Sequence, residues 1–92
     1  EQNQYKIVDR NFYSRFGEID IIAFKDNVFH FVEVKSGDTF EPIYNITPAK
    51  LKKIIKTMNL YIKKHKINSA YQIDAVIVKN SNIEIIENIS MF

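Results

Sequence analysis

Residues 16–35, which read FGEIDIIAFKDNVFHFVEVK, combine two strand patterns with charged side chains and constrain the fold more than any other stretch. The β-branched and aromatic residues on both sides of Asp26-Asn27 are typical of β-strands. Asp and Asn tolerate the positive φ of a tight turn, so the two strands should form a hairpin. Four charged residues interrupt its apolar pattern: Glu18, Asp20, Glu33 and Lys35.

The length of the hairpin loop decides which of these residues face each other. With a two-residue loop at 26–27, or with a four-residue loop, Asp20 faces Glu33. In the same register Glu18 faces Lys35. Because side chains alternate between the faces of a strand, we expect all four on one side of the sheet. Like charges that face each other directly destabilise a sheet, so Asp20 and Glu33 predict a cation between their carboxylates.

Two carboxylates and a nearby lysine suit metal-dependent hydrolysis of a phosphodiester. Mg²⁺ takes oxygen ligands, usually one or two carboxylates together with water and substrate phosphate. Lys35 could orient the attacking water or neutralise the charge that develops on the phosphate. A second interpretation stays open, in which Glu33 and Lys35 form a weak ion pair on a solvated strand face. Apolar residues expected on the same face favour partial burial, which a solvated face does not explain.

Composition narrows the class of protein. The 92 residues suffice for one domain, 1–92, and 46% hydrophobic with 26% charged residues is typical of a globular chain. The chain has no cysteine, which excludes disulfides, thiolate zinc sites and cysteine nucleophiles. Two glycines cannot build a P-loop or a dinucleotide-binding turn. The chain has neither a membrane-length apolar run nor a signal-peptide pattern, which predicts a cytoplasmic protein without a membrane partner.

The remaining segments predict a mixed sheet. Thr47-Pro48 is a helix start, since Thr can cap and Pro suits the first helical position. Apolar residues then recur at three- and four-residue spacing, with lysines on the other face. Further strands are expected at 5–13, 71–79 and 83–89. The predicted order is β-β-β-α-β-β in an α/β or α+β domain, and the crossover through the helix makes the third and fourth strands parallel.

The predicted helix is strongly basic. Seven of the thirteen basic residues lie between 50 and 66, and no Asp or Glu lies between Glu41 and Asp74. Such a face can follow a nucleic-acid backbone, although a solvated helix face is the common alternative. The residues expected to contact phosphates are Lys50, Lys52, Lys53 and Lys56.

Arg15 is a further candidate for nucleic-acid binding, and Glu18 and Asp74 are candidates for accessory roles. Arg15 precedes the strand of Asp20 and could contact phosphates, or be an ordinary surface arginine. Asp74 interrupts an apolar strand that should lie beside Glu33, where it and Glu18 could support the site. A buried carboxylate satisfied by backbone donors is the alternative for Asp74.

The segment RFGEIDIIAF, followed by FHFVEVKSG, resembles the YraN-like bacterial proteins, an uncharacterised family assigned to the PD-(D/E)XK nuclease superfamily. That superfamily includes restriction endonucleases and Holliday junction resolvases. The likeness runs from Tyr5 to the end of the chain, and GEID with E-V-K thirteen residues later is its specific element. The resemblance implies a restriction-endonuclease-like fold. It also implies that Asp20, Glu33 and the backbone carbonyl of Val34 coordinate Mg²⁺ or Mn²⁺, with Lys35 as the catalytic lysine.

Two features depart from that family pattern. The family's N-terminal helix, whose Glu points into the site, is expected to be missing from these 92 residues, and Gly37 stands where a basic residue often follows the motif. The sequence still predicts a metal-dependent endonuclease that hydrolyses DNA phosphodiesters, with branched DNA as one substrate class. One alternative is a catalytically inactive nucleic-acid-binding module with the same fold. Another is an interaction domain whose lysine helix binds an acidic protein, and a homodimer is left open.

Overall fold

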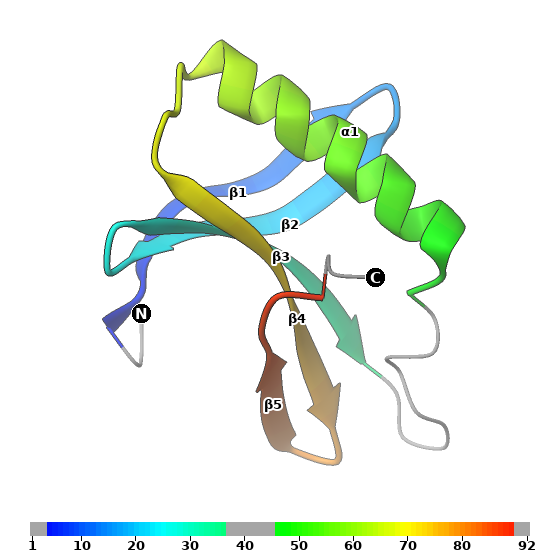
Figure 1. The fold of residues 1–92 in the computed structure, drawn as a ribbon. Coiled ribbons are helices and arrows are strands. Elements are labelled where there is room, and N and C mark those ends of the chain that lie inside the picture. The colour runs from blue at the N-terminus through cyan, green and yellow to red at the C-terminus, as the bar shows by residue number, and fades with distance from the viewer. Residues whose placement is uncertain (1–3, 37–45, 90–92) are drawn as a thin grey trace.

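The computed structural model describes residues 4–36 and 46–89, so Gly37 lies outside the described part. Within those residues the strands and the helix follow the predicted order β-β-β-α-β-β. Their bounds are Lys6–Ser14 (β1), Gly17–Lys25 (β2), Val28–Ser36 (β3), Pro48–Lys64 (α1), Ala70–Lys79 (β4) and Asn82–Ile86 (β5). The strands form a five-stranded mixed sheet in the order β1-β2-β3-β4-β5, and α1 crosses one of its faces (Figure 1). The predicted α+β architecture with a mixed sheet is therefore confirmed.

The hairpin of β2 and β3 has the predicted register near its turn. Ile22 pairs with Phe31, as a loop at 26–27 requires. Asp26 and Asn27 have φ values of 51° and 65°, and two successive positive φ angles give a turn whose twist matches that of the strands. The turn chemistry therefore sets the register from which the position of each carboxylate follows.

β3 and β4 are parallel, as predicted, and α1 connects them. The hydroxyl oxygen of Thr47 accepts a hydrogen bond from the Lys50 amide at 3.2 Å, and Pro48 is the first helical residue. The first amides of a helix have no partner within it, so this cap stabilises the start of α1. The buried residues of α1 are Leu51, Ile54, Thr57, Met58 and Tyr61.

The apolar core lies between α1 and the sheet. Ile22 and Phe31 are fully buried there, and the Tyr61 ring packs edge-on against Phe31 with centroids 5.8 Å apart. The lysines of α1 are exposed, which is the division of faces that the sequence predicts. Within residues 4–36 and 46–89, no helix has the length and apolar character needed to cross a membrane.

The last strand is shorter than predicted. β5 ends at Ile86 instead of residue 89. The chain then turns at Asn88, which has a φ of 57° and donates its amide to a carboxylate oxygen of Asp74 at 2.9 Å. The end of the strand therefore depends on a side chain of the neighbouring strand.

Asp74 belongs to a buried polar network on the face of the sheet opposite α1. His30 Nδ1 lies 2.6 Å from Asp74 Oδ2, and Gln72 Nε2 donates to Asp74 Oδ1 at 2.8 Å. Ile73 belongs to the core, so alternation directs Asp74 to the other face. β4 lies beside Glu33 as expected, through Ala75, but Asp74 itself lies beside Val32. Of the two interpretations of Asp74, the structure has the buried carboxylate satisfied by neighbouring donors and not the support of the site.

We expect Asp74→Ala to lower the free energy of unfolding by about 2–4 kcal/mol, because it removes the acceptor of the buried His30 ring and the acceptor of the Asn88 amide. Asp74→Asn keeps one acceptor oxygen and should cost less. Urea unfolding measures both. A carboxylate that served the metal site instead would give the opposite pattern, with stability kept and the response to metal removed.

Candidate metal and phosphate site

The candidate site lies where β2 and β3 part. Their backbone pairing extends as far as Ile21 and Val32. β3 stays paired with β4 up to Ser36, whereas the first residues of β2 stay paired with β1. In Figure 1 the start of β2 and the end of β3 lie well apart. The sheet therefore opens into a fork, and Asp20 and Glu33 are the first residues beyond the last pair.

A local irregularity directs Asp20 into the fork. Ile19 and Ile22 are both buried in the core although strict alternation would place them on opposite faces. Asn11, which the register of β1 and β2 places opposite Asp20, has a φ of 52°. The Asp20 side chain turns towards β3, where its Oδ2 accepts a hydrogen bond from the Val34 amide at 2.8 Å. The Asp20 carboxylate oxygen thus takes the place of the β2 backbone carbonyl that would accept this hydrogen bond in a continuous sheet.

Glu33 is the neighbour of Asp20, as predicted, and its side chain is 15% exposed. Burial raises the pKa of Glu33 to about 7, and hydrogen bonding to Asp20 and repulsion by its charge act in the same direction. Lys35 Nζ lies 3.9 Å from Glu33 Oε1 and lowers this pKa only in part. The two carboxylates therefore form a site that favours a proton or another cation between them.

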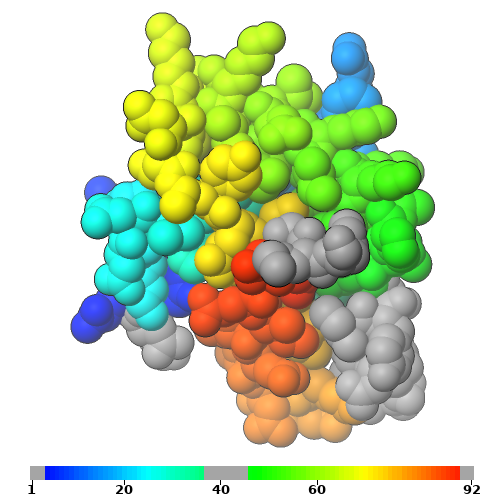
Figure 2. Space-filling view, in the orientation of Figure 1, coloured from blue at the N-terminus to red at the C-terminus, as the bar shows by residue number. Residues whose placement is uncertain are grey.

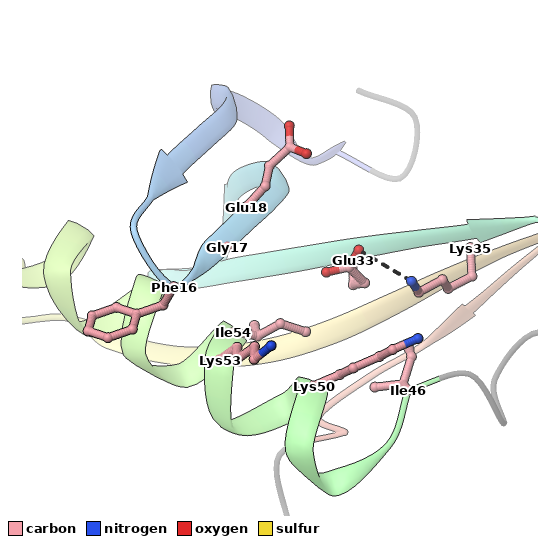
Figure 3. A pocket seen from close by; sticks show the side chains of 9 residues that line it. All are labelled: Phe16, Gly17, Glu18, Glu33, Lys35, Ile46, Lys50, Lys53 and Ile54. Atoms are coloured by element: carbon pink, nitrogen blue, oxygen red, sulfur yellow. Dashed lines mark ion pairs between the residues drawn. The ribbon is translucent and has the colours of Figure 1, made fainter.

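Glu18 does not face Lys35 as predicted, although it belongs to the lining of the pocket described below. It pairs with Tyr13 of β1, and hydrogen bonding to Glu18 raises the pKa of the Tyr13 hydroxyl. Figure 3 shows the Glu18 carboxylate pointing away from α1, whereas Lys35 reaches towards Glu33. The expected facing of Glu18 and Lys35 is wrong because the pairing of β2 with β3 ends before it reaches them.

A pocket of about 150 Å³ opens between the fork and α1 (Figure 3). Glu33 and Lys35 line it from β3, and Lys50 and Lys53 line it from α1. Phe16, in the turn between β1 and β2, lines its far end. The fold therefore brings two of the predicted phosphate-binding lysines, which lie far from the hairpin in sequence, to the same pocket as the predicted catalytic residues.

The other predicted phosphate-binding residues lie beside this pocket. The Arg15 guanidinium carbon and the Lys56 Nζ are 4.9 Å and 5.1 Å from the centroid of the Phe16 ring. Lys52 is exposed on α1 and is not part of the pocket lining. Phe16 was not singled out from the sequence. The sequence feature that could have indicated it is an aromatic residue in the turn 14–17, where small or polar residues are usual.

Figure 2 shows the hairpin of β4 and β5, which extends below the helix. This hairpin lies away from the turn between β1 and β2 that borders the pocket (Figure 1). Val78 pairs with Ile83 in that hairpin, and Ile83 is exposed. Asp74 is the candidate from the sequence that lies on β4, and neither it nor any other described residue of this hairpin lines the pocket.

Comparison with known proteins shows the family. Residues 1–78 match the uncharacterised protein family UPF0102. The chain belongs to this family. A UPF0102 protein of Helicobacter hepaticus is 60% identical over 87 residues, which are 95% of this chain and 79% of that protein. One of Wolinella succinogenes is 60% identical over 87 residues, 95% of this chain and 81% of its own. One of Helicobacter pylori strain HPAG1 is 58% identical over 86 residues, which are 94% of this chain and 75% of that protein.

In this UPF0102 chain the donors at the fork suit a hard divalent cation. Asp20 and Glu33 supply carboxylate oxygens, the ligands that Mg²⁺ prefers. The Val34 amide points towards Asp20, and the carbonyl of an extended residue points to the same side as its amide. The predicted third ligand, the Val34 carbonyl, is therefore on the correct side of β3.

A second group of potential metal donors consists of His30, Asp74 and Glu87, with ligand atoms within 4.8 Å of one another. Both carboxylate oxygens of Asp74 already accept hydrogen bonds. A cation there would have to displace the partners that hold the end of β5. The fork is the better candidate, because its carboxylates repel each other without a cation.

The raised pKa of Glu33 predicts a pH dependence of stability in the presence of a chelator. The ordinary pKa is 4.5 and the folded pKa about 7, so between these values the folded protein binds a proton that the unfolded chain releases. The free energy of unfolding should therefore fall as pH rises from about 4.5 to 7. Glu33→Gln removes this contribution and should exceed the native protein in stability at about pH 8 but not at about pH 4.

Glu84→Gln, at an exposed glutamate of β5, is the matched control and should keep the native pH profile. Denaturant unfolding across about pH 4–8 measures all three proteins. A constant difference between Glu33→Gln and the native protein at every pH would contradict the assignment.

Proposed function

We propose that this protein is a metal-dependent DNA hydrolase with a restriction-endonuclease-like, PD-(D/E)XK-type site. In this proposal Asp20, Glu33 and the Val34 carbonyl hold Mg²⁺ or Mn²⁺, and Lys35 acts at the scissile phosphate. The observation that carries it is the meeting of two carboxylates at a fork of strands, with Lys35 3.9 Å from one of them. The mixed sheet with parallel β3 and β4 is compatible with that fold.

The cost of holding two carboxylates together supports a cation-binding role. A hydrophobic strand pair would be more stable with neutral residues at these positions, because burial and mutual repulsion both disfavour the charged form of Glu33. The Val34 amide helps to hold Asp20 where it is, so Asp20 cannot move away to relieve the repulsion without losing that bond. Such an arrangement fits a role in binding better than a role in stability.

The lysines of the pocket suit a phosphodiester. A divalent ion at the carboxylates would stabilise charge on the phosphate and lower the pKa of a coordinated water. Lys35 would donate to a phosphate oxygen or to the attacking water from the same face of β3. Lys50 and Lys53 would bind the phosphate on the other wall of the pocket, since both belong to its lining.

A DNA-binding module without catalysis is the second candidate. The observation that favours it is the position of Glu18, which lines the pocket but hydrogen-bonds to Tyr13, so that Asp20 and Glu33 are the carboxylates in contact at the fork. The lysines of α1 would bind DNA equally well in both cases. Response to metal and cleavage separate the two candidates.

We expect Mg²⁺ or Mn²⁺ to raise the melting temperature, because an ion that binds only the folded state stabilises it. At about ten times the Kd the gain is about 1.4 kcal/mol, or roughly 6–11 °C for a chain of this size. Asp20→Asn and Glu33→Gln should remove the response. These replacements are preferable to alanine because Asn at position 20 can still accept the Val34 amide.

Lys35→Ala should keep the thermal response to metal and reduce cleavage of DNA by about 100-fold or more. Cleavage is followed on single-stranded, duplex and branched DNA. Metal binding without cleavage of any of them would favour the non-catalytic module, and absence of both would reject the metal site.

Charge at the pocket end of α1 should set the salt dependence of DNA binding. We expect Lys50→Ala with Lys53→Ala to make the slope of log K against log salt shallower, by about 0.9 for each phosphate of duplex DNA that is no longer neutralised. The matched control is Lys63→Ala with Lys66→Ala, which removes the same charge from exposed residues at the other end of the helix. Fluorescence anisotropy between about 50 and 200 mM salt gives the slopes. Equal changes in both double variants would mean that the pocket is not the phosphate site.

A further inference from the structure

Phe16 is an aromatic residue in the turn between β1 and β2, at the end of the pocket that contains Glu33 and Lys35. Its ring has two cations as neighbours, with the Arg15 guanidinium 4.9 Å and the Lys56 ammonium 5.1 Å from the centroid. The fold of the sheet does not require an aromatic residue here, because Phe16 belongs to neither strand. Surfaces that bind single-stranded nucleic acid combine aromatic rings with neighbouring cations in this way.

The turn that carries Phe16 is fixed to α1. Ser14 Oγ lies 2.7 Å from Thr57 Oγ1, and Thr57 is fully buried. The same Ser14 oxygen accepts a hydrogen bond from the Phe16 amide at 3.0 Å. Gly17 follows with a φ of 152°, a conformation that side-chain-bearing residues rarely adopt. The backbone of the turn that carries the ring is therefore held against the helix before any ligand binds.

The neighbours of the ring can be exchanged for a base. Arg15 and Lys56 are both outside the core, so their interactions with the ring are weak and their side chains can move into solvent. A nucleobase stacks on an aromatic ring more strongly than an exposed cation does. The displaced cations would then stand beside the phosphates that flank the stacked base.

We propose that Phe16 stacks against one unpaired base at the far end of the pocket in which Glu33 and Lys35 would bind a phosphate. The site would therefore prefer single-stranded or locally unpaired DNA to continuous duplex. The proposal rests on the proposed function in one respect, that DNA enters this pocket. A base inside a duplex has both faces covered by its neighbours and cannot reach the ring without being turned out of the stack. The pocket, at about 150 Å³, is a local hollow that could take part of one nucleotide.

The test compares the affinity for oligothymidine with that for a duplex of equal length, in EDTA to prevent cleavage. We expect Phe16→Ala and Phe16→Leu to weaken binding of oligothymidine about tenfold and to change duplex binding less than about twofold. Phe16→Trp keeps a stacking surface and should bind as the native protein does. The salt slope should be unchanged in all three variants, because the ring neutralises no phosphate.

The chain contains no tryptophan, so Phe16→Trp also introduces a single fluorophore at the proposed stacking position. Its emission should be quenched by oligothymidine and much less by duplex. Tyr13→Trp is the control, since Tyr13 lies on the same hairpin, is 70% exposed and is not part of the pocket lining. Its emission should respond weakly to both ligands.

Three results would overturn the inference. Phe16→Leu could bind oligothymidine as tightly as the native protein, or Phe16→Ala could weaken both ligands equally, or Phe16→Trp could respond to both alike. In each of these cases the native protein still binds DNA, so the inference fails and the proposed function does not. If the native protein binds neither ligand, the proposed function and the inference fail together.

Discussion

The hydrogen bond from the Val34 amide to the Asp20 carboxylate makes the rest of the site possible. Two central strands cannot part inside a protein unless the backbone groups that they release find other partners. Asp20 supplies one such partner at 2.8 Å, so β2 and β3 can separate beyond Ile21 and Val32 without leaving that amide unsatisfied. The opening that results is where the pocket forms. The Asp20 carboxylate therefore has both a structural role and a proposed chemical role. Asp20→Asn separates the two, because Asn can still accept the Val34 amide.

The surrounding fold explains why the two carboxylates cannot avoid each other. β3 lies between β2 and β4, and its residue Phe31 is fully buried beneath α1. A shift of β3 by one residue would turn Phe31 out of the core, so the strand cannot slide to separate Glu33 from Asp20. The pKa of Glu33 is raised for this reason, and a proton, a lysine or a metal ion are the available ways of lowering the energy. The core thus holds the site in an electrostatically unfavourable state.

Local rules predicted the parts of this arrangement that depend on few residues. Asp26-Asn27 set the hairpin register, and Thr47-Pro48 marked the start of α1, because turn and cap chemistry act within a few positions. The position of Glu18 could not be obtained in this way. It depends on the irregularity at Asp20, which involves a left-handed residue on a different strand, Asn11. A strict period of two cannot anticipate such a break.

The same limit explains why the sequence left two roles open for Asp74 and did not single out Phe16. The partners of Asp74 come from β3, from β4 itself and from the backbone beyond β5, so its role appears only once the parallel pairing and the course of the chain after β5 are known. The surroundings of Phe16 come from Thr57 and Lys56 on a helix that is distant in sequence.

Neighbouring residues of β3 connect the two faces of the sheet. His30 is held by Asp74 on one face and Phe31 by α1 on the other, so both interactions fix the strand that carries Glu33. The buried network far from the pocket is therefore part of what keeps the fork open at a fixed register.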